Sequence, residues 1–359
     1  MADSKQAPLD AAAAAKAAFA SVQDKPFPND IFTAPELRWA VIGCGVIANQ
    51  MAQSLALAGR KLAGVANRTL SKAQVFAEQY GVEKVYDTVD DLYADSDIDA
   101  VYITTPHNTH ITYLRAALAA GKHVLCEKAI TLNTAELDEA RAIANEHNVV
   151  LMDATTVLHM PLYQELRRRM DAGDFGRMNL AQLNFGSYKE YGDLTNRFYN
   201  RNLAGGAMLD IGVYALSVMR LSMASQPTEF VSLGNTCETG VDVAGGIVCR
   251  NAEQQLGVVS LTLHSKQPKR SVISFDKCYI EVNEYPRADH ATIVWTADGH
   301  REEVHAGTEA YALCYEMADL EKAVAGDDSK CELLSYASDV MELMTKLRAD
   351  WGVVYPEEE

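Results

Sequence analysis

Near its start the chain reads Trp39-Ala40-Val41-Ile42-Gly43-Cys44-Gly45-Val46-Ile47-Ala48, followed by a segment rich in alanine and leucine. This pattern predicts a buried strand, a glycine turn and then a helix. Gly43 permits a tight turn, Gly45 leaves space for a phosphate, and Ala48 lets the helix pack closely on its strand. Because N–H groups at a helix start bind phosphate, we predict a dinucleotide site at Gly43, Gly45, Val46 and Ile47.

Length and charge restrict the class of protein. The chain has 359 residues, 48% of them hydrophobic, which is enough for a large core and predicts two domains. A formal net charge of −17 argues against nucleic acid or an anionic membrane as a partner. No apolar run approaches the roughly 20 residues of a membrane helix, and the acidic start, with Asp3 and Asp10, is unlike a secretion signal. The seven cysteines lack C-x-x-C or zinc-like spacing, which predicts reduced thiols and a cytoplasmic protein.

Residues 1–35 read as an arm that precedes the first strand. Ala11 to Ala20 consists almost entirely of helix-forming residues, and Pro26, Pro28 and Pro35 then interrupt regular structure. Such an arm is either a frayed surface helix or a contact to a neighbouring subunit.

Residues 36–157 alternate between strand and helix patterns. Further strands are predicted at 61–66, 98–104, 122–126 and 149–152. This succession predicts an α/β fold with a doubly wound parallel sheet, in which the carboxyl ends of the strands form one crevice. We expect the loops after these strands to contact the cofactor through Asn67, Thr105, Pro106, His110 and Glu127.

Residues 158–359 show a different pattern. Short alternating segments follow Gly176, and Asp298-Gly299 marks a hairpin turn, so we predict an α+β domain with a large, mainly antiparallel open sheet. Helices are expected at 309–325 and 336–350, and the acidic end, Glu357 to Glu359, is expected to be solvated. Because a sheet with one free face often pairs across subunits, we expect a homodimer or homotetramer.

The end of the second strand decides which dinucleotide fits. An NAD site usually carries an acid about 20 residues after the glycines, but no Asp or Glu lies between Glu36 and Glu78. Five basic residues occupy the same interval: Arg38, Arg60, Lys61, Arg68 and Lys72. We therefore predict that Arg68 and Lys72 bind a 2′-phosphate beside Asn67, which favours NADP with NAD as the alternative. For Lys72, a simply exposed helix position is an equal interpretation.

Two groups of residues could carry chemistry. Lys128 follows the strand at 122–126, where its ammonium could polarise a carbonyl oxygen or hold a hydroxyl at the crevice. Asp210 and Tyr214, four residues apart after Gly205-Gly206, would share a helix face and could orient a substrate hydroxyl and pass its proton. Taken singly, each has a structural alternative: a surface lysine, an acid at a helix start and a half-buried packing tyrosine.

Four motifs together resemble the Gfo/Idh/MocA oxidoreductases. They are Gly43 to Ala48, Thr105-Pro106-His107-Asn108-Thr109-His110, Gly121 to Lys128, and Gly205 to Tyr214. The resemblance implies a Rossmann domain, Lys128 as catalytic lysine, Asp210 as the residue that orients substrate, and Tyr214 at the acid/base position. A tyrosine at this position is typical of the branch that resembles the dihydrodiol, xylose and glucose–fructose oxidoreductases. Members of that branch often use NADP.

The chain departs from this family pattern at two places. Ala129 stands where the motif has proline, and the loop from Asp153 to Pro161 differs from that of the diol and xylose enzymes. His159, Tyr188 and Arg197 are secondary candidates for contacts with the substrate.

The resulting hypothesis is an NAD(P)-dependent oxidoreductase that moves a hydride between nicotinamide and a secondary alcohol or ketone of a sugar, sugar derivative or cyclic polyol. One alternative is a lyase or glycosidase that retains its nicotinamide and oxidises a sugar transiently. Another is a dinucleotide-sensing protein without catalysis. His107 and His110 lack a carboxylate or cysteine at ligand spacing, so no metal is expected.

Overall fold

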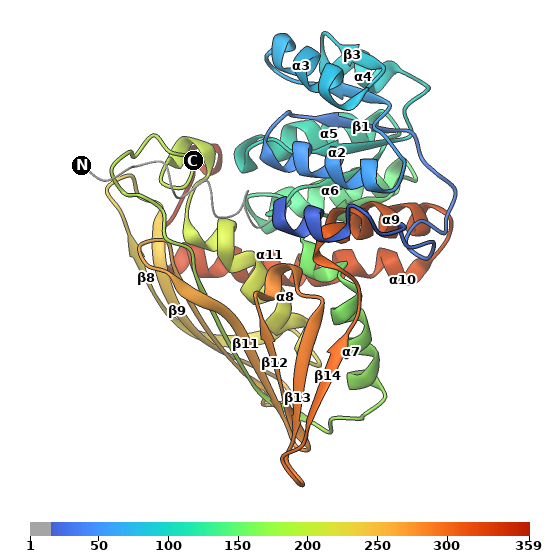
Figure 1. Cartoon of the computed structure of the whole chain (residues 1–359). Helices are drawn as coiled ribbons and strands as arrows, with labels where there is room; N and C mark the ends of the chain where they lie inside the picture. Colours follow the sequence, from blue (N-terminus) through green and yellow to red (C-terminus); the bar gives the residue numbers. More distant parts are fainter. Residues whose placement is uncertain (1–15) are drawn as a thin grey trace, which may run out of the picture. The chain divides into compact units, whose positions relative to one another are not determined.

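The computed structural model describes residues 16–359 and contains two compact units. Unit 1 comprises the chain through Thr131, Ala135–Ala154 and Ala310–Ser335. Unit 2 comprises Leu132–Thr134, Thr155–Glu309 and Tyr336–Glu359. Figure 1 labels the helices and strands of both units.

Unit 1 is built on a six-stranded parallel sheet with the order β3-β2-β1-β4-β5-β6. This is the strand order of the doubly wound dinucleotide-binding fold, so the predicted fold class is confirmed. The strands are β1 (Trp39–Ile42), β2 (Gly64–Ala66), β3 (Lys84–Tyr86), β4 (Ala100–Ile103), β5 (His123–Cys126) and β6 (Leu151–Asp153). The connecting helices are α2 (Val46–Leu57), α3 (Leu70–Tyr80), α4 (Val89–Ala94), α5 (His110–Ala119) and α6 (Thr134–Glu146).

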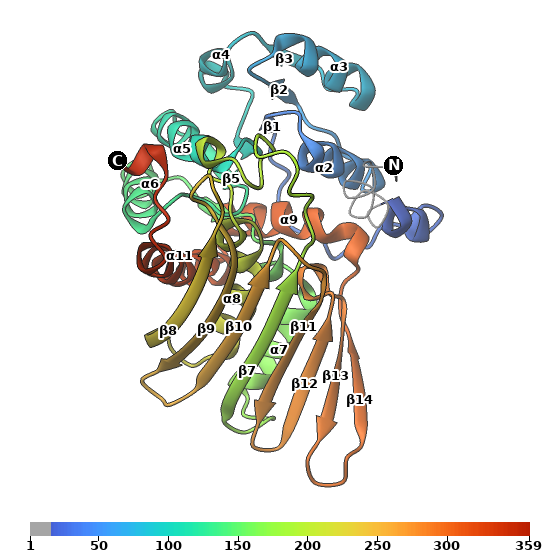
Figure 2. The same ribbon diagram turned by 90° about the vertical axis from the view of Figure 1, so that its left-hand side faces the viewer.

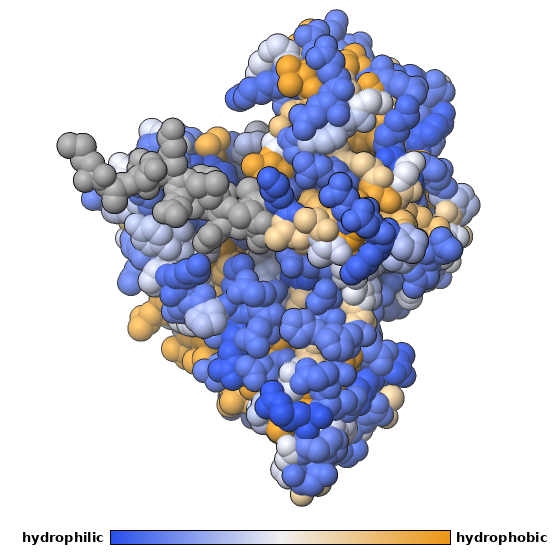
Figure 3. Space-filling view, in the orientation of Figure 1, coloured by the Kyte–Doolittle hydropathy of each residue, from blue (hydrophilic) through white to orange (hydrophobic). Residues whose placement is uncertain are grey.

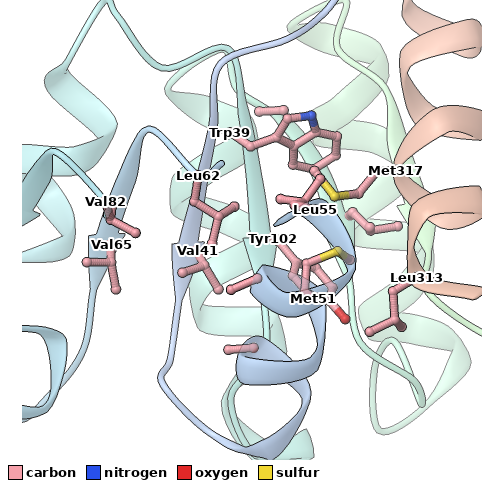
Figure 4. Packing of buried hydrophobic residues seen from close by; sticks show 14 of the residues in the cluster. Trp39, Val41, Met51, Leu55, Leu62, Val65, Val82, Tyr102, Leu313 and Met317 are labelled. Carbon is pink, nitrogen blue, oxygen red and sulfur yellow. The ribbon is translucent and has the colours of Figure 1, made fainter. Parts of the chain in front are cut away.

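The core of unit 1 includes a helix from far along the sequence. Helix α9 (Ala312–Val324) buries Leu313 and Met317 in the same cluster as Met51 and Leu55 of α2, and Figure 4 shows these side chains close together. The short helix α10 (Asp328–Cys331) also belongs to unit 1. The sequence predicts that all of 158–359 forms one domain, whereas Ala310–Ser335 packs with the nucleotide-binding unit because the apolar face of α9 completes its core.

The described part of the N-terminal arm packs on unit 1. Residues 16–22 are helical, and Val22 and Ile31 are buried. The Phe27 ring lies 5.9 Å from Phe32 and 5.0 Å from Tyr311, centroid to centroid. The helix predicted from Ala11 onward lies outside the described residues as far as residue 15.

Unit 2 contains an eight-stranded sheet with the order β14-β13-β12-β11-β7-β10-β9-β8. All neighbouring strands are antiparallel except β7 and β10, which confirms the mainly antiparallel sheet. The strands are β7 (Met178–Gly186), β8 (Pro227–Thr236), β9 (Asp242–Asn251), β10 (Leu256–Thr262), β11 (Gln267–Phe275), β12 (Cys278–Asn283), β13 (His290–Trp295) and β14 (Arg301–His305).

Helices cover one face of this sheet. Helix α8 (Val213–Ser222) packs on β7 and β10, and α7 (Pro161–Asp171) packs beside α8. Figure 2 shows α7 and α8 behind the sheet and the opposite face toward the viewer. Helix α11 (Leu333–Asp350) leads to the C-terminal residues. The predicted hairpin turn at Asp298-Gly299 lies between β13 and β14, with Gly299 at φ +72°.

Among the described residues, one helical segment, Arg201–Ser222, is long and apolar enough to cross a membrane by length and composition. The expectation that no apolar run approaches the length of a membrane helix is therefore wrong for this segment by length and composition. Its apolar window is 83% buried inside the structure, as expected of a helix in a protein core, so it is weak evidence for a membrane span.

Candidate active site

The glycine turn after β1 has the conformation that its sequence predicts. Gly43 has φ +102°, and a Cβ there would lie 2.7 Å from Thr104 Oγ1. Gly45 precedes α2 and has no side chain to cap it, while a Cβ at Gly45 would meet no atom within 4 Å. The first N–H groups of α2 are therefore open to an external acceptor, which fits a pyrophosphate.

The basic stretch divides into paired and unpaired residues. Arg38 forms ion pairs with Asp97 and Asp99, Arg60 with Glu36 and Glu321, and Lys61 with Glu83. Three of the five basic residues of this stretch therefore neutralise carboxylates of unit 1. Within residues 16–359, Arg68 and Lys72 take part in no salt bridge, and both are exposed.

Lys72 lies close to the glycine turn. Burial raises the pKa of the Cys44 thiol to about 11, and the positive charge of Lys72 opposes this shift. Asn67 donates its side-chain N–H to the carbonyl of Thr69, 2.9 Å away, which shapes the loop between β2 and α3. Phosphate binding by Arg68 and Lys72 stays a prediction.

The loop after β4 supports the backbone around Lys128. His107 Nε2 lies 3.0 Å from the Lys128 carbonyl oxygen, and His110 Nδ1 lies 3.0 Å from that of Ala129. The peptide bond between Lys128 and Ala129 is cis. The two histidines thus contact consecutive carbonyl groups at the position of the predicted catalytic lysine.

The structure differs from the sequence prediction at His110. The sequence predicts a contact with the cofactor, but the residue is fully buried, and its second ring nitrogen, Nε2, lies 2.8 Å from the Thr105 carbonyl oxygen. Burial lowers the pKa of His110, while the backbone carbonyls oppose this shift. Since both ring nitrogens face the backbone, the side chain positions the loops after β4 and β5 instead of contacting a dinucleotide.

The remaining predicted residues of this loop region lie at the carboxyl ends of β4 and β5. Pro106 is exposed at the start of a short 3-10 turn, and the Thr105 hydroxyl accepts a hydrogen bond from Thr109 Oγ1 at 2.9 Å. The Glu127 carboxylate accepts a hydrogen bond from the Tyr102 hydroxyl. Tyr102 is a supporting residue that the sequence analysis missed, because nothing in the pattern of β4 distinguishes it from a packing aromatic.

The second group of residues lies in unit 2. A Cβ at Gly205 would lie 2.6 Å from the Arg197 carbonyl oxygen, so the backbone passes too closely for any side chain. Asp210 is 8% exposed and pairs with Arg197 Nη2 at 3.4 Å. The segment Met208–Gly212 is π-helical, and Tyr214 follows in the first turn of α8. Asp210 therefore lies in a wider helical turn than an α-helix has, whereas Tyr214 is α-helical.

The secondary substrate candidates differ from one another. Arg197 contacts Asp210, its side chain is 60% exposed, and its guanidinium lies 4.2 Å from the centroid of the Phe198 ring. Tyr188 is exposed, whereas His159 is buried. The Tyr214 ring lies 6.1 Å from that of Phe185. The structure thus brings Arg197 to Asp210, while the meeting of Lys128 of unit 1 with Asp210 and Tyr214 of unit 2 stays a prediction.

Comparison with known proteins decides the family. Residues 37–155 match the oxidoreductase family with an NAD-binding Rossmann fold, Gfo/Idh/MocA, and residues 163–281 match the Gfo/Idh/MocA C-terminal domain. The chain belongs to the Gfo/Idh/MocA family. As a member of this family it is an NAD(P)-dependent oxidoreductase.

Curated relatives of this Gfo/Idh/MocA protein include trans-1,2-dihydrobenzene-1,2-diol dehydrogenases. The mouse enzyme is 31% identical over 254 residues, which cover 69% of this chain and 75% of that protein. The pig enzyme is 28% identical over 340 residues, which cover 90% and 99%.

Solved structures of the same fold include levoglucosan dehydrogenase in complex with NADH and levoglucosan. It has a TM-score of 0.78 at 18% identity and covers 88% of this chain and 97% of that one. KijD10, a 3-ketoreductase from Actinomadura kijaniata in complex with NADP and TDP-benzene, has a TM-score of 0.75 at 24% identity and covers 88% and 98%.

Proposed function

We propose that this protein is an NADP-preferring dehydrogenase or reductase of a secondary alcohol or ketone in a sugar, sugar derivative or cyclic polyol. The dihydrobenzenediol dehydrogenase relatives support a ring-borne hydroxyl as the reacting group. The observation that carries the proposal is the environment of Asp210, a buried carboxylate with a guanidinium partner, in a helical segment that follows a backbone approach at Gly205 too close for any side chain. Such an arrangement is suited to holding a hydroxyl in one orientation.

In the proposed mechanism each side chain acts on the substrate oxygen atoms. A nicotinamide cofactor, when bound, would supply or accept the hydride. The Tyr214 phenol exchanges the proton of the reacting hydroxyl, and the Lys128 ammonium donates a hydrogen bond to the same oxygen and stabilises its negative charge. Asp210, held by Arg197, accepts a hydrogen bond from a neighbouring hydroxyl and fixes the ring.

The test is turnover with a panel of sugars, cyclic polyols and trans-diols, followed at the absorbance band of the reduced cofactor. We expect Lys128→Ala and Tyr214→Phe each to lower kcat by roughly 100-fold or more, with the KM for NADPH nearly unchanged. Full turnover by either variant would reject its assigned role. Substrate consumption without any net absorbance change would instead indicate transient oxidation by a retained nicotinamide.

The preference for NADP is proposed from the unpaired cations after β2. Arg68 and Lys72 are exposed, lie outside every salt bridge of the described residues, and occupy the loop and first turn after the strand where a ribose 2′ group is expected. A guanidinium and an ammonium are suited to a 2′-phosphate and give no advantage with a free hydroxyl.

We also propose a homodimer or homotetramer that associates through the open face of the unit 2 sheet. Val231 and Leu233 of β8 are 77% and 84% exposed, and Val248 of β9 pairs with Val231 in register. Figure 3 shows hydrophobic residues reaching the surface where β8 and β9 lie. Light scattering should give a mass of two or four chains for the wild type and a lower mass for Leu233→Glu, whereas a monomeric wild type would reject the proposal.

A cytosolic location forms part of the same proposal. All seven cysteines are free thiols, which suits a reducing compartment.

A further inference from the structure

The loop that leads to Asp210 is held by a residue close to the C-terminus. The hydroxyl of Tyr355 donates a hydrogen bond to the Gly205 carbonyl oxygen at 2.7 Å. Tyr355 is fully buried, so this bond is shielded from water. The bond joins two segments of unit 2 that are 150 residues apart in the sequence.

A second buried side chain holds the same loop from the first residue of β9. Asp242 is fully buried, and its Oδ2 accepts a hydrogen bond from the Met208 N–H at 2.6 Å. A Cβ at Gly206, which has φ +124°, would overlap Asp242 Oδ1. Gly206 is therefore required both by its backbone conformation and by the closeness of this carboxylate. Asp242 acts as a helix cap supplied from another strand, at the start of the helical segment that carries Asp210.

The segment that carries Tyr355 is anchored in turn by an ion pair. Arg348, which is buried at the end of α11, binds both carboxylate oxygens of Glu358, at 2.9 and 2.8 Å. Glu358 also accepts hydrogen bonds from the Tyr355 N–H and from Asn133 Nδ2, each at 3.0 Å. The expectation that the acidic C-terminus is simply solvated is thus wrong for Glu358, because a buried arginine needs its charge.

Trp351 adds a third point of attachment for this segment. Its indole N–H donates to Ser232 Oγ at 3.0 Å, and its ring covers Gly234 of β8 and Gly245 of β9, where any Cβ would overlap it. Gly234 and Gly245 are directly paired in the sheet. The Trp351 ring therefore packs directly on the backbone of this glycine pair. These contacts fix the position of the segment from Trp351 to Glu358 on unit 2.

We propose that Tyr355 and Asp242 are positioning residues that set the location of Asp210 and Tyr214, and that the segment Trp351–Glu358 serves the active site through them. The inference rests on the proposed function of Asp210 and Tyr214. Its physical basis is that the two side chains fix the backbone at Gly205 and at Met208, two residues before Asp210. A displacement of about 1 Å in an orienting group can cost roughly 100-fold in rate.

The decisive experiment compares two tyrosine variants that lose the same kind of bond. Tyr355→Phe removes the hydrogen bond to Gly205, and Tyr163→Phe removes an equally buried hydrogen bond, from Tyr163 to the Tyr285 carbonyl oxygen at 2.7 Å. We expect similar losses of thermal stability in both. Only Tyr355→Phe should lower kcat, by about 10- to 100-fold, with the KM for NADPH unchanged.

The same experiment includes outcomes that overturn the inference. Wild-type kcat in Tyr355→Phe, or an equal loss in Tyr163→Phe, would show that the bond serves stability alone. Should Tyr355→Phe not fold, Glu358→Gln tests the same segment without touching the aromatic ring, and unchanged kcat there would reject the role of the segment. Full activity of Tyr214→Phe would instead reject the role proposed for Tyr214, on which this inference rests, so the two failures are distinguishable.

Discussion

Replacing Arg68 with alanine should convert an NADP-preferring site into one that no longer discriminates well between the two dinucleotides. Arg68 follows β2 directly, is exposed, and forms no salt bridge among residues 16–359. A charge-assisted hydrogen bond contributes roughly 1.5–3 kcal/mol. Because solvent and salt screen an exposed pair, we expect the lower end of this range, which corresponds to about a tenfold weaker affinity for NADPH.

The assay is the dissociation constant of NADPH and of NADH, measured by fluorescence titration of the wild type and the variant. Lys61→Ala is the matched control, since it removes one positive charge from the same basic stretch, where Lys61 pairs with Glu83. We expect the control to change both constants by less than about twofold. The loss in Arg68→Ala should shrink as ionic strength rises.

An equal loss of NADPH and NADH binding in Arg68→Ala would refute this reasoning. It would mean that the guanidinium contacts a part of the dinucleotide common to both cofactors, or supports the fold of the loop. An unchanged NADPH constant would mean that no phosphate reaches Arg68, and Lys72, whose charge is felt at Cys44, would remain as the candidate.

Two further predictions separate folding from binding and test a buried acid. Gly45→Ala should keep the wild-type melting temperature, because its Cβ meets no atom within 4 Å, yet it should weaken binding of both cofactors. Gly43→Ala should unfold at a lower temperature, because Gly43 has a positive φ and lies close to Thr104. Equal melting temperatures for the two variants would contradict this prediction. Burial raises the pKa of Asp242 from 3.8 to about 6, so the folded state binds an extra proton between these values and the group lowers stability as pH rises. The unfolding free energy of the wild type relative to Asp242→Asn should therefore fall by about 2 kcal/mol between pH 4 and pH 7 in urea titrations, and a constant difference would show that Asp242 does not titrate there.

The nucleotide-binding fold is the part that sequence predicts best. The glycine turn restricts the backbone locally, since Gly43 needs a positive φ and Ala48 must be small to pack, and these limits act within ten residues. The apolar strand runs then follow from burial on both faces of a parallel sheet. Sequence could not assign α9 to this unit, because an apolar helix face indicates burial without naming the surface that buries it.

The number of charged residues in a stretch of sequence predicts the cofactor site less well than the glycine pattern predicts the fold. Counting residues between Glu36 and Glu78 gives an uninterrupted positive stretch, yet Arg60 binds Glu321, which is 261 residues away. Ion pairs form in space, so a local count of charges measures the surface potential only when the distant partners are known. Arg68 and Lys72, which the sequence assigns to the 2′-phosphate, form no salt bridge among residues 16–359, so that assignment does not depend on the three paired cations.

The candidate site contains proposed catalytic residues and residues that support their backbone, and the sequence predicts the two kinds unequally. Lys128, Asp210 and Tyr214 are visible in the sequence because their motifs contain glycines and strand ends. His110, Asp242 and Tyr355 hold those motifs through backbone carbonyl and N–H groups, which every residue type offers. A hydrogen bond to a backbone group does not require a particular residue type in its partner. A supporting residue is therefore recognised only from the folded structure.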